Sequence, residues 1–310
     1  MRRLLLAASF SLLAGAAIGR PLSYAQRVLP PSRAPGPAVE PFVAINAQRL
    51  ALVHVRVIDG TGAPALADRT VLIKGGRIVS IGGPELPIPR GSTVLNLAGH
   101  SVLPGLIGMH DHLFYIARPD LNAKGHFEPP LLAPQMTFSA PRLYLAAGVT
   151  TLRTTGSVEP YTDINLKAQI DAGKLPGPHM DITAPYLEGK SNLFVQMHQL
   201  TGPNDARRTV DFWAEEGMTS FKAYMHITRA ELGAAIQEAH RLGLKITGHL
   251  CAVTYPQAAR LGIDDLEHGF FVNTELDPGK KPDQCTPGDG AATLGKMKAG
   301  GQAARALIRL

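Results

Sequence analysis

Histidines and one lysine recur at the ends of short apolar segments of this chain. The stretch LPGLIGMHDHLF, residues 103–114, ends an apolar run with His110 and His112, two residues apart. Because successive side chains of a strand point to opposite faces, both imidazoles would project to the same side. Two such imidazoles are half of a metal site. A His-x-His pair alone is a weak signal, so the later segments decide its meaning.

Three later segments carry residues of the same kind. The segment FKAYM places Lys222 in the middle of an apolar run. A buried lysine needs a partner or a function, because its uncompensated charge is costly. The segment ITGHL carries His249 near its end, and LEHGF carries His268. One such histidine has an ordinary structural explanation, but an ordered set of them indicates a common site.

Alternating strands and helices after Leu103 would position these residues. The predicted strands are 103–109, 149–154, 179–184, 219–225, 244–250 and 263–269. The predicted helices are 139–147, 163–173, 205–217, 228–242 and 254–261. This alternation predicts a parallel sheet, open or closed into a barrel whose strands all end at one mouth. His110, His112, Lys222, His249 and His268 would then meet there.

Helix ends are marked in two places. Asp205 is the expected N-cap of the helix 205–217, and Gly217 is expected to end it. Thr228 precedes Glu231 by three residues, which predicts a capping box at the start of the next helix.

A smaller all-β unit precedes the alternating part. Its predicted strands are 50–58, 70–74, 77–82 and 92–99. Gly75-Gly76 joins the second and third as a tight hairpin. The unit, residues 46–102, is expected to be the N-terminal part of a small β-sandwich domain.

The strand–helix pattern stops after about six units, where a closed barrel of this type has eight. An open sheet of that kind would expose apolar edges and part of its core. Residues 273–310 are expected to be an irregular tail followed by a basic, alanine-rich helix to Leu310.

The first 25 residues have the features of a secretory signal. Arg2 and Arg3 precede an apolar core that ends at Gly19, and Ser23-Tyr24-Ala25 offers a cleavage site. An uncleaved anchor is the alternative, although the core is shorter than the roughly 20 residues of a spanning helix. Residues 26–45 are rich in proline and alanine and indicate a flexible leader. The protein is therefore expected to be periplasmic or secreted, without stable membrane insertion after cleavage.

Charge and cysteine content narrow the function classes. The formal charge of +6 falls to +3 without the signal, which holds three arginines and no acidic residue. The basic clusters, such as Arg207-Arg208 and Lys280-Lys281, are short and are not interleaved with aromatic residues. Nucleic acid is therefore excluded as a partner. Cys251 and Cys285 are too few for a disulfide scaffold, and whether they pair stays open.

These motifs together resemble the amidohydrolase superfamily, in its imidazolonepropionase-like and prolidase-like branch. The resemblance rests on PGLIGMHDH, FKAYM, TGHL and LEHG, preceded by VIDGTG and GGRIVSIG, and covers roughly residues 48 to 275. It implies an incomplete TIM-like (β/α) barrel over residues 103–272, preceded by the β-sandwich unit. It also implies a small-molecule substrate, while the oligomeric state stays open.

The resemblance implies a role for each motif residue. His110 and His112 would bind the first metal ion, and His249 and His268 the second. Lys222 would react with carbon dioxide to form a carbamate that bridges two ions, expected to be zinc. Hydroxide held by the ions would then attack a carbonyl carbon. The expected bond is carbon–nitrogen but not an ordinary peptide bond, as in a cyclic amide.

The chain departs from the family pattern in two ways. The family has a strand-eight aspartate that binds metal and transfers a proton, and this chain has no equivalent. Asp277, Asp283 and Asp289 all lie in the loop-like segment, which suggests a C-terminally truncated member. Leu250-Cys251 follows His249 where dipeptidases of the family carry alanine and an aromatic residue, which weighs against a dipeptidase.

Other functions stay open beside the leading one. A non-catalytic metal-binding remnant would keep the histidines without turnover, and a purely structural protein would bind no metal. Within the enzyme class, a lactonase, phosphoesterase or dipeptidase would use the same attack. Tyr224 could face substrate or pack, and His226 could face substrate or solvent. Ordinary structural or surface roles are expected for His54, His100, His126, His179, His198 and His240.

Overall fold

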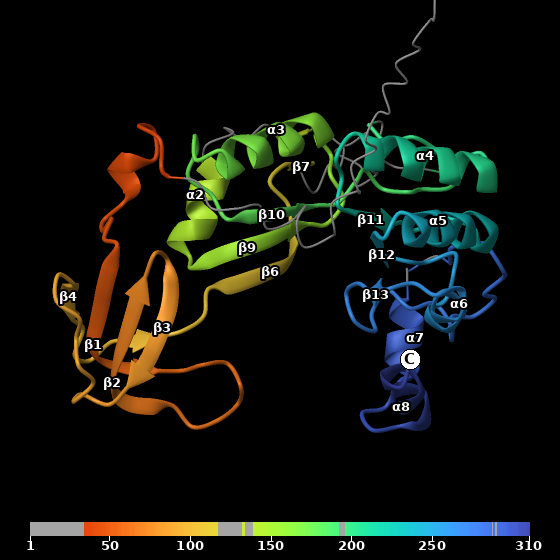
Figure 1. The fold of residues 1–310 in the computed structure, drawn as a ribbon. Coiled ribbons are helices and arrows are strands. Elements are labelled where there is room, and N and C mark those ends of the chain that lie inside the picture. Colours follow the sequence, from red (N-terminus) through yellow and green to blue (C-terminus); the bar gives the residue numbers. More distant parts are fainter. Residues whose placement is uncertain (1–33, 117–131, 134–138, 192–195, 287, 289) are drawn as a thin grey trace, which may run out of the picture.

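The computed structural model describes residues 34–116, 132–133, 139–191, 196–286, 288 and 290–310. The predicted signal peptide, residues 26–33 of the predicted leader, His126 and Asp289 lie outside these residues. Figure 1 shows the arrangement: a β-sheet near the N-terminus, a strand–helix part across the molecule, and short helices at the C-terminus.

The N-terminal part is a five-stranded sheet. Its strands are β1 (Arg49–Val57), β2 (Leu66–Lys74), β3 (Arg77–Gly82), β4 (Thr93–Asn96) and β5 (Ser101–Val102). The order is β3-β2-β1-β4, with β5 also on β1. Gly75 and Gly76 have φ of 57° and 74°, so the predicted glycine hairpin between β2 and β3 is confirmed. A second layer, as in the expected sandwich, is absent from the part of this region that the structure describes.

The strand–helix part contains two three-stranded parallel sheets. The first comprises β6 (Leu106–Asp111), β9 (Val149–Thr154) and β10 (His179–Ile182), and the second β11 (Ser220–Ala223), β12 (Lys245–Gly248) and β13 (Asp265–Leu266). A parallel bridge between Thr183 and Ser220 links the two, so the six strands follow one another in chain order. The predicted parallel strands are confirmed. No described strand joins β13 to β6, so these sheets do not close into a barrel.

Helices follow the strands as the alternation predicts. They are α2 (Ser139–Ala146), α3 (Pro160–Asp171), α4 (Pro203–Glu215), α5 (Arg229–Arg241) and α6 (Tyr255–Leu261). A two-stranded hairpin of β7 (Tyr115–Ile116) and β8 (Leu132–Ala133) lies between β6 and α2. The result is a mixed α/β fold.

The main core lies between the parallel strands and their helices. Leu152, Ile182, Phe221 and Ile246 come from four successive strands and are completely buried in one cluster. Burial of such a side chain stabilises the fold by about 1.5–3 kcal/mol.

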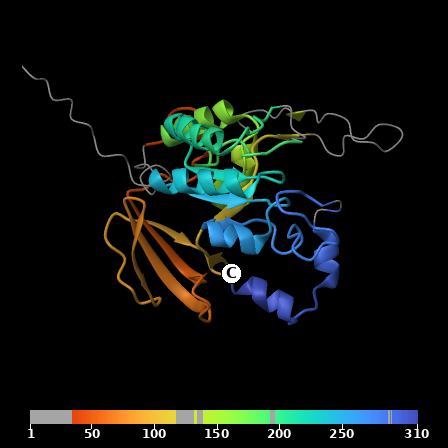
Figure 2. The same cartoon turned by 90° about the vertical axis from the view of Figure 1, so that its right-hand side faces the viewer.

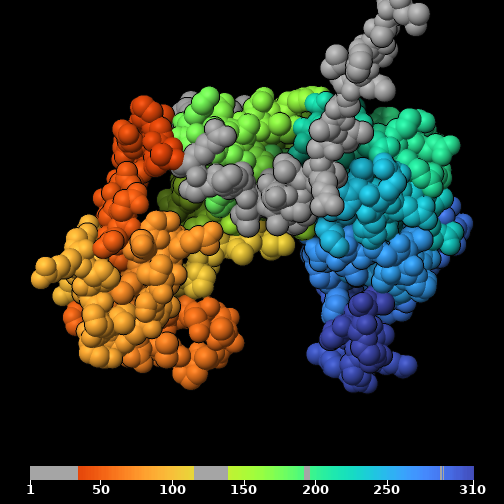
Figure 3. Space-filling model, viewed as in Figure 1, coloured from red at the N-terminus to blue at the C-terminus, as the bar shows by residue number. Residues whose placement is uncertain are grey.

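The edge strand β6 is different. Leu106, Ile107 and Met109 are 56%, 62% and 58% exposed. The expected exposed apolar edge is therefore confirmed. In Figure 3 the segment that contains β6 (yellow) borders a hollow between the N-terminal sheet and the C-terminal helices.

Helix capping was predicted correctly once and incorrectly once. Thr228 and Glu231 form the predicted capping box of α5. The prediction that Asp205 caps α4 is wrong, because the helix starts at Pro203 with Gly202 as N-cap. Proline is favoured at the first helical position, which moves the start toward the N-terminus. The Asp205 carboxylate instead accepts hydrogen bonds from the N–H and hydroxyl of Thr201.

The described ends of the chain are folded against the rest. In the predicted leader, the 3-10 helix η1 (Glu40–Phe42) follows Gly36, whose N–H donates to the Gly173 carbonyl over 2.8 Å. The C-terminal helix is two short helices, α7 (Ala291–Lys296) and α8 (Gln302–Ile308), because Gly300-Gly301 intervenes. Figure 2 shows the N-terminal sheet and these helices on the same side of the strand–helix part. None of the described helices is long and apolar enough to cross a membrane.

Candidate metal centre

The structure brings the predicted histidines together at the carboxyl ends of the parallel strands. His110 lies in β6 and His112 directly follows it, while His249 and His268 follow β12 and β13. The ring centroids of His110 and His112 are 5.5 Å apart, as expected for residues two apart on a strand. The His268 ring lies 4.5 Å from His110 and 4.4 Å from His249.

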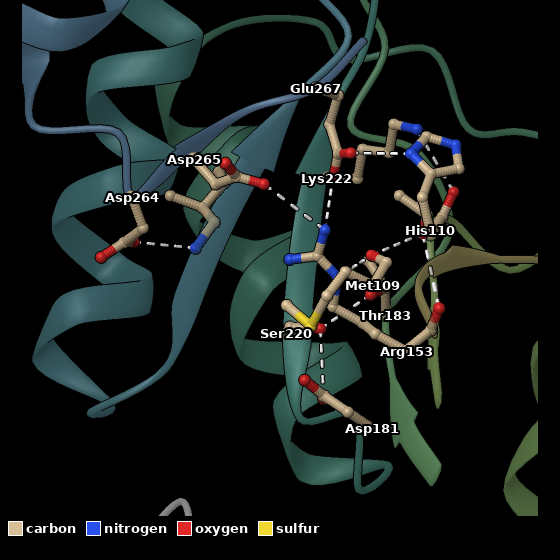
Figure 4. Close-up of polar contacts among 12 residues, drawn as sticks. Met109, His110, Arg153, Asp181, Thr183, Ser220, Lys222, Asp264, Asp265 and Glu267 are labelled. Carbon is tan, nitrogen blue, oxygen red and sulfur yellow. Dashed lines mark hydrogen bonds and ion pairs between the residues drawn. The ribbon is translucent and has the colours of Figure 1, made fainter. Parts of the chain in front are cut away.

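Lys222 lies on β11 beside this histidine cluster, as Figure 4 shows next to His110. It is 1% exposed. Its ammonium donates to the Thr155 carbonyl over 3.4 Å and lies 5.5 Å from the centre of the Tyr186 ring. Burial lowers the pKa of Lys222 to about 8, although the Glu267 carboxylate opposes this shift. A substantial fraction of the amine is therefore neutral near pH 8.

Two charged residues that the sequence did not indicate complete the cluster: Glu267 and Arg153. Glu267 accepts a hydrogen bond from His110 Nδ1 over 2.7 Å and one from Arg153 Nη2 over 2.6 Å (Figure 4). Burial alone would raise the pKa of Glu267, but the His110 hydrogen bond and the charges of Lys222 and Arg153 lower it to about 2. The carboxylate is thus ionised and can only accept, so His110 donates from Nδ1, and Nε2 is the ring nitrogen that could bind a metal ion.

The deeper imidazoles are neutral. Burial, and then the charge of Lys222, lowers the pKa of His112 to about 4. Burial and the neighbouring His249 lower the pKa of His268 to about 3. Nε2 of His268 is buried without a hydrogen-bond partner among the described residues. His268 also has φ of 67°, a strained conformation for a non-glycine residue, of the kind that clusters at functional sites.

Solved structures share this architecture. A protein from Bifidobacterium longum named as a putative prolidase matches with a TM-score of 0.57 and 26% identity, over 74% of this chain and 56% of that chain. The chain therefore shares its fold with prolidase-like and amidohydrolase-family proteins. A Xaa-Pro dipeptidase with bound methionine matches this chain with a TM-score of 0.57 and 20% identity, over 72% of this chain and 62% of that chain. Phenylurea hydrolase B matches with a TM-score of 0.55 and 18% identity, over 70% and 59%.

This chain thus spans about three fifths of the length of those chains. No protein-family model and no curated protein matches its sequence.

The donor set of the cluster suits a divalent ion. Neutral imidazoles are zinc ligands, and a ligating histidine commonly donates its other N–H to a carboxylate, as His110 does to Glu267. The buried Nε2 of His268 is a further available donor atom. Among the described residues, no group of three or more His, Cys, Asp or Glu side chains is arranged so that it could hold a metal ion. The chemistry of the residues fits a metal, although the rings are not arranged around one point.

Tyr224 and His226 lie beside the cluster with different environments. Tyr224 is buried and stacks on Tyr186, with ring centroids 4.4 Å apart and planes within 8°. A Cβ on Gly156 would lie 1.7 Å from the Tyr186 ring, so only glycine fits there. His226 Nδ1 lies 3.3 Å from the buried carboxylate of Glu188, another residue that the sequence did not indicate.

The remaining described histidines are exposed, in agreement with their expected surface roles. His54 pairs with Asp68, His198 with Asp205, and His240 with Asp264. His100 and His179 are also exposed.

Proposed function

We propose that this chain is a metal-dependent hydrolase of carbon–nitrogen bonds in small molecules. The observation that carries the proposal is the buried lysine, Lys222, beside the neutral imidazoles of His112 and His268 at the carboxyl ends of parallel strands. The strands would form part of a TIM-like barrel, preceded by a β-sandwich unit. His110 and His112 would hold one ion, and His249 and His268 the other.

Zinc ions at this site would lower the pKa of water and polarise the substrate carbonyl. Lys222 would supply a neutral amine that can react with carbon dioxide; with the loss of one proton, its side chain would become an anionic carbamate able to bind the ions. Glu267 keeps the His110 proton on Nδ1, and Arg153 holds Glu267 in place.

Two substrate classes follow from different observations. A non-peptide amide, such as a cyclic amide, follows from Leu250-Cys251 after His249. A dipeptide with a C-terminal proline follows from the names of the prolidase and Xaa-Pro dipeptidase structures. We place the non-peptide amide first and the dipeptide second.

The proton-transfer carboxylate expected of the family has no described counterpart at the cluster. Asp277 accepts hydrogen bonds from Thr286 and Thr293, and Asp283 pairs with Arg229. We therefore assign this proton-transfer role to no described residue. A chain that lacked it altogether would be a metal-binding protein without turnover.

Export is part of the proposal. Cys251 and Cys285 form a disulfide, and disulfides persist in oxidising compartments. This pairing supports a periplasmic or secreted location and the interpretation of residues 1–25 as a signal peptide.

Metal analysis of the purified chain tests the proposal. We expect about two equivalents of zinc. They should be lost in His110→Ala and His249→Ala and retained in the control His240→Ala, whose ring pairs with Asp264 at the surface. Hydrolysis of cyclic amides, ureas or Xaa-Pro dipeptides then identifies the substrate. Zinc content that is equal in all four proteins would refute the site, and zinc binding without hydrolysis of any substrate would favour the non-catalytic alternative.

A further inference from the structure

The segment after β13, residues 274–286, folds back onto the loop that follows β12. The Cys251–Cys285 disulfide joins them, with the two Cα atoms 4.8 Å apart. The Thr274 hydroxyl donates to the Cys251 carbonyl over 2.7 Å. The Lys280 ammonium donates to the carbonyls of Cys251 and Ala252 over 2.6 and 2.9 Å. Four separate contacts therefore meet on two consecutive residues.

The segment is braced internally as well. Lys280 also donates to the Gln284 carbonyl, so three backbone carbonyls surround its ammonium. The carboxylate of Asp277 accepts from the hydroxyls of Thr286 and Thr293 and from the N–H of Thr293. These internal hydrogen bonds fix the conformation of residues 274–286, so the segment can restrain the backbone to which it is attached.

The segment is attached next to the histidine cluster, through Cys251 and Ala252. Cys251 stands two residues after His249, and the N–H of His249 donates to the Ala223 carbonyl, one residue after Lys222. At its other end the segment continues from the loop of His268, whose ring lies 5.7 Å from that of Phe271. The loops that carry His249 and His268 are thus connected to each other through residues 274–286.

We propose that residues 274–286 form a clamp that positions His249 relative to His268, with Lys280 and the Cys251–Cys285 disulfide as its two attachments. Lys280 is a positioning residue in this arrangement, because it acts on the imidazole through the backbone of Cys251 and Ala252. The proposal rests on the proposed function insofar as the two imidazoles bind metal.

Hydrogen exchange tests the clamp without requiring metal. In Lys280→Met and in Cys251→Ser/Cys285→Ser, the amides of His249 and Ala252 should exchange about tenfold faster than in the parent. Those amides donate to Ala223 and Met225 in the parent. The control is Lys167→Met, whose ammonium donates to the Asp171 carboxylate within α3 over 2.8 Å and is not part of residues 274–286. Exchange that is unchanged in both test variants would overturn the proposal.

Cobalt(II) titration with visible spectra then reports on ligand geometry. We expect Lys280→Met to weaken cobalt binding about tenfold and to change the spectrum, as loss of an outer-shell support does, and Lys280→Arg to restore both. An unchanged spectrum and affinity in Lys280→Met would refute a positioning role. If the parent binds no cobalt, the proposed function fails, while the exchange measurement still decides whether the clamp exists.

Discussion

Glu267 and Arg153 form a buried ion pair inside the candidate metal centre. Their side chains are 5% and 9% exposed, and Arg153 also donates to the Met109 carbonyl. His110, by contrast, could be predicted, because a His-x-His pair at the end of an apolar strand is visible within one short window. Glu267 is separated from His110 by 157 residues and from Arg153 by 114 residues in the sequence. No local sequence pattern could therefore predict these two contacts.

Removal of the Glu267 charge should destabilise the protein. Glu267→Gln removes the buried anion of the Arg153 guanidinium and leaves it only the half-exposed Asp265 carboxylate at 3.5 Å, which costs about 3 kcal/mol of unfolding free energy at pH 7 in urea denaturation. Because the folded pKa of Glu267 is about 2, below its ordinary value of 4.5, its contribution is complete above pH 4.5 and disappears as the pH falls toward 2. The parent and the variant should therefore converge in acid.

A double variant provides the control for that experiment. Glu267→Gln/Arg153→Met removes both charges, and most of the lost stability should return. Equal destabilisation in the single and double variants would contradict the assignment of the cost to an unpaired guanidinium.

At the start of α3, burial outweighs the tendency of a helix N-terminus to favour an ionised carboxylate. Asp163 lies in the first turn of α3, where the helix dipole favours a negative charge. Burial nevertheless raises the pKa of Asp163 to about 7, although the Ser157 hydroxyl donates to its carboxylate. The sequence predicted α3 itself from its apolar spacing, but burial at one position depends on elements that only the folded chain brings together.

Asp163→Asn should therefore stabilise the protein at alkaline pH. The native state keeps its proton up to about pH 7, whereas the unfolded chain releases it near 3.8, so stability falls as the pH rises through that window. We expect the variant to exceed the parent by about 2–4 kcal/mol at pH 8 and by almost nothing near pH 4. In a chain that keeps Asp163, Ser157→Ala should increase the loss of stability between pH 4 and pH 8, because it removes the hydrogen bond from the Ser157 hydroxyl to the ionised carboxylate. An advantage of Asp163→Asn that is constant with pH would contradict this account.

At the scale of the whole molecule, the sequence predicted the strand order and the parallel direction because each strand–helix unit carries its own periodicity. The helix starts were less certain: α4 begins two residues before its expected cap, at a proline. The relation between distant parts could not be predicted in this way. The attachment of residues 274–286 to the His249 loop depends on contacts between backbone carbonyls and side chains that leave no periodic signal.

The exposed edge strand β6 predicts how the molecule associates in solution. Parallel strands are normally covered on both faces, yet Ile107 and Met109 are more than half exposed on a strand that pairs with β9 on one side and with no described strand on the other. Such an edge pairs readily with another chain, so the parent should self-associate increasingly with concentration in sedimentation velocity. Ile107→Lys places a charge on the edge and should raise the monomer fraction, whereas Ile308→Lys, on a helix at a site 71% exposed, should not. If both variants raise the monomer fraction equally, added surface charge rather than the open edge of β6 is responsible. A parent protein that stays monomeric at every concentration would show that β6 does not pair with another chain.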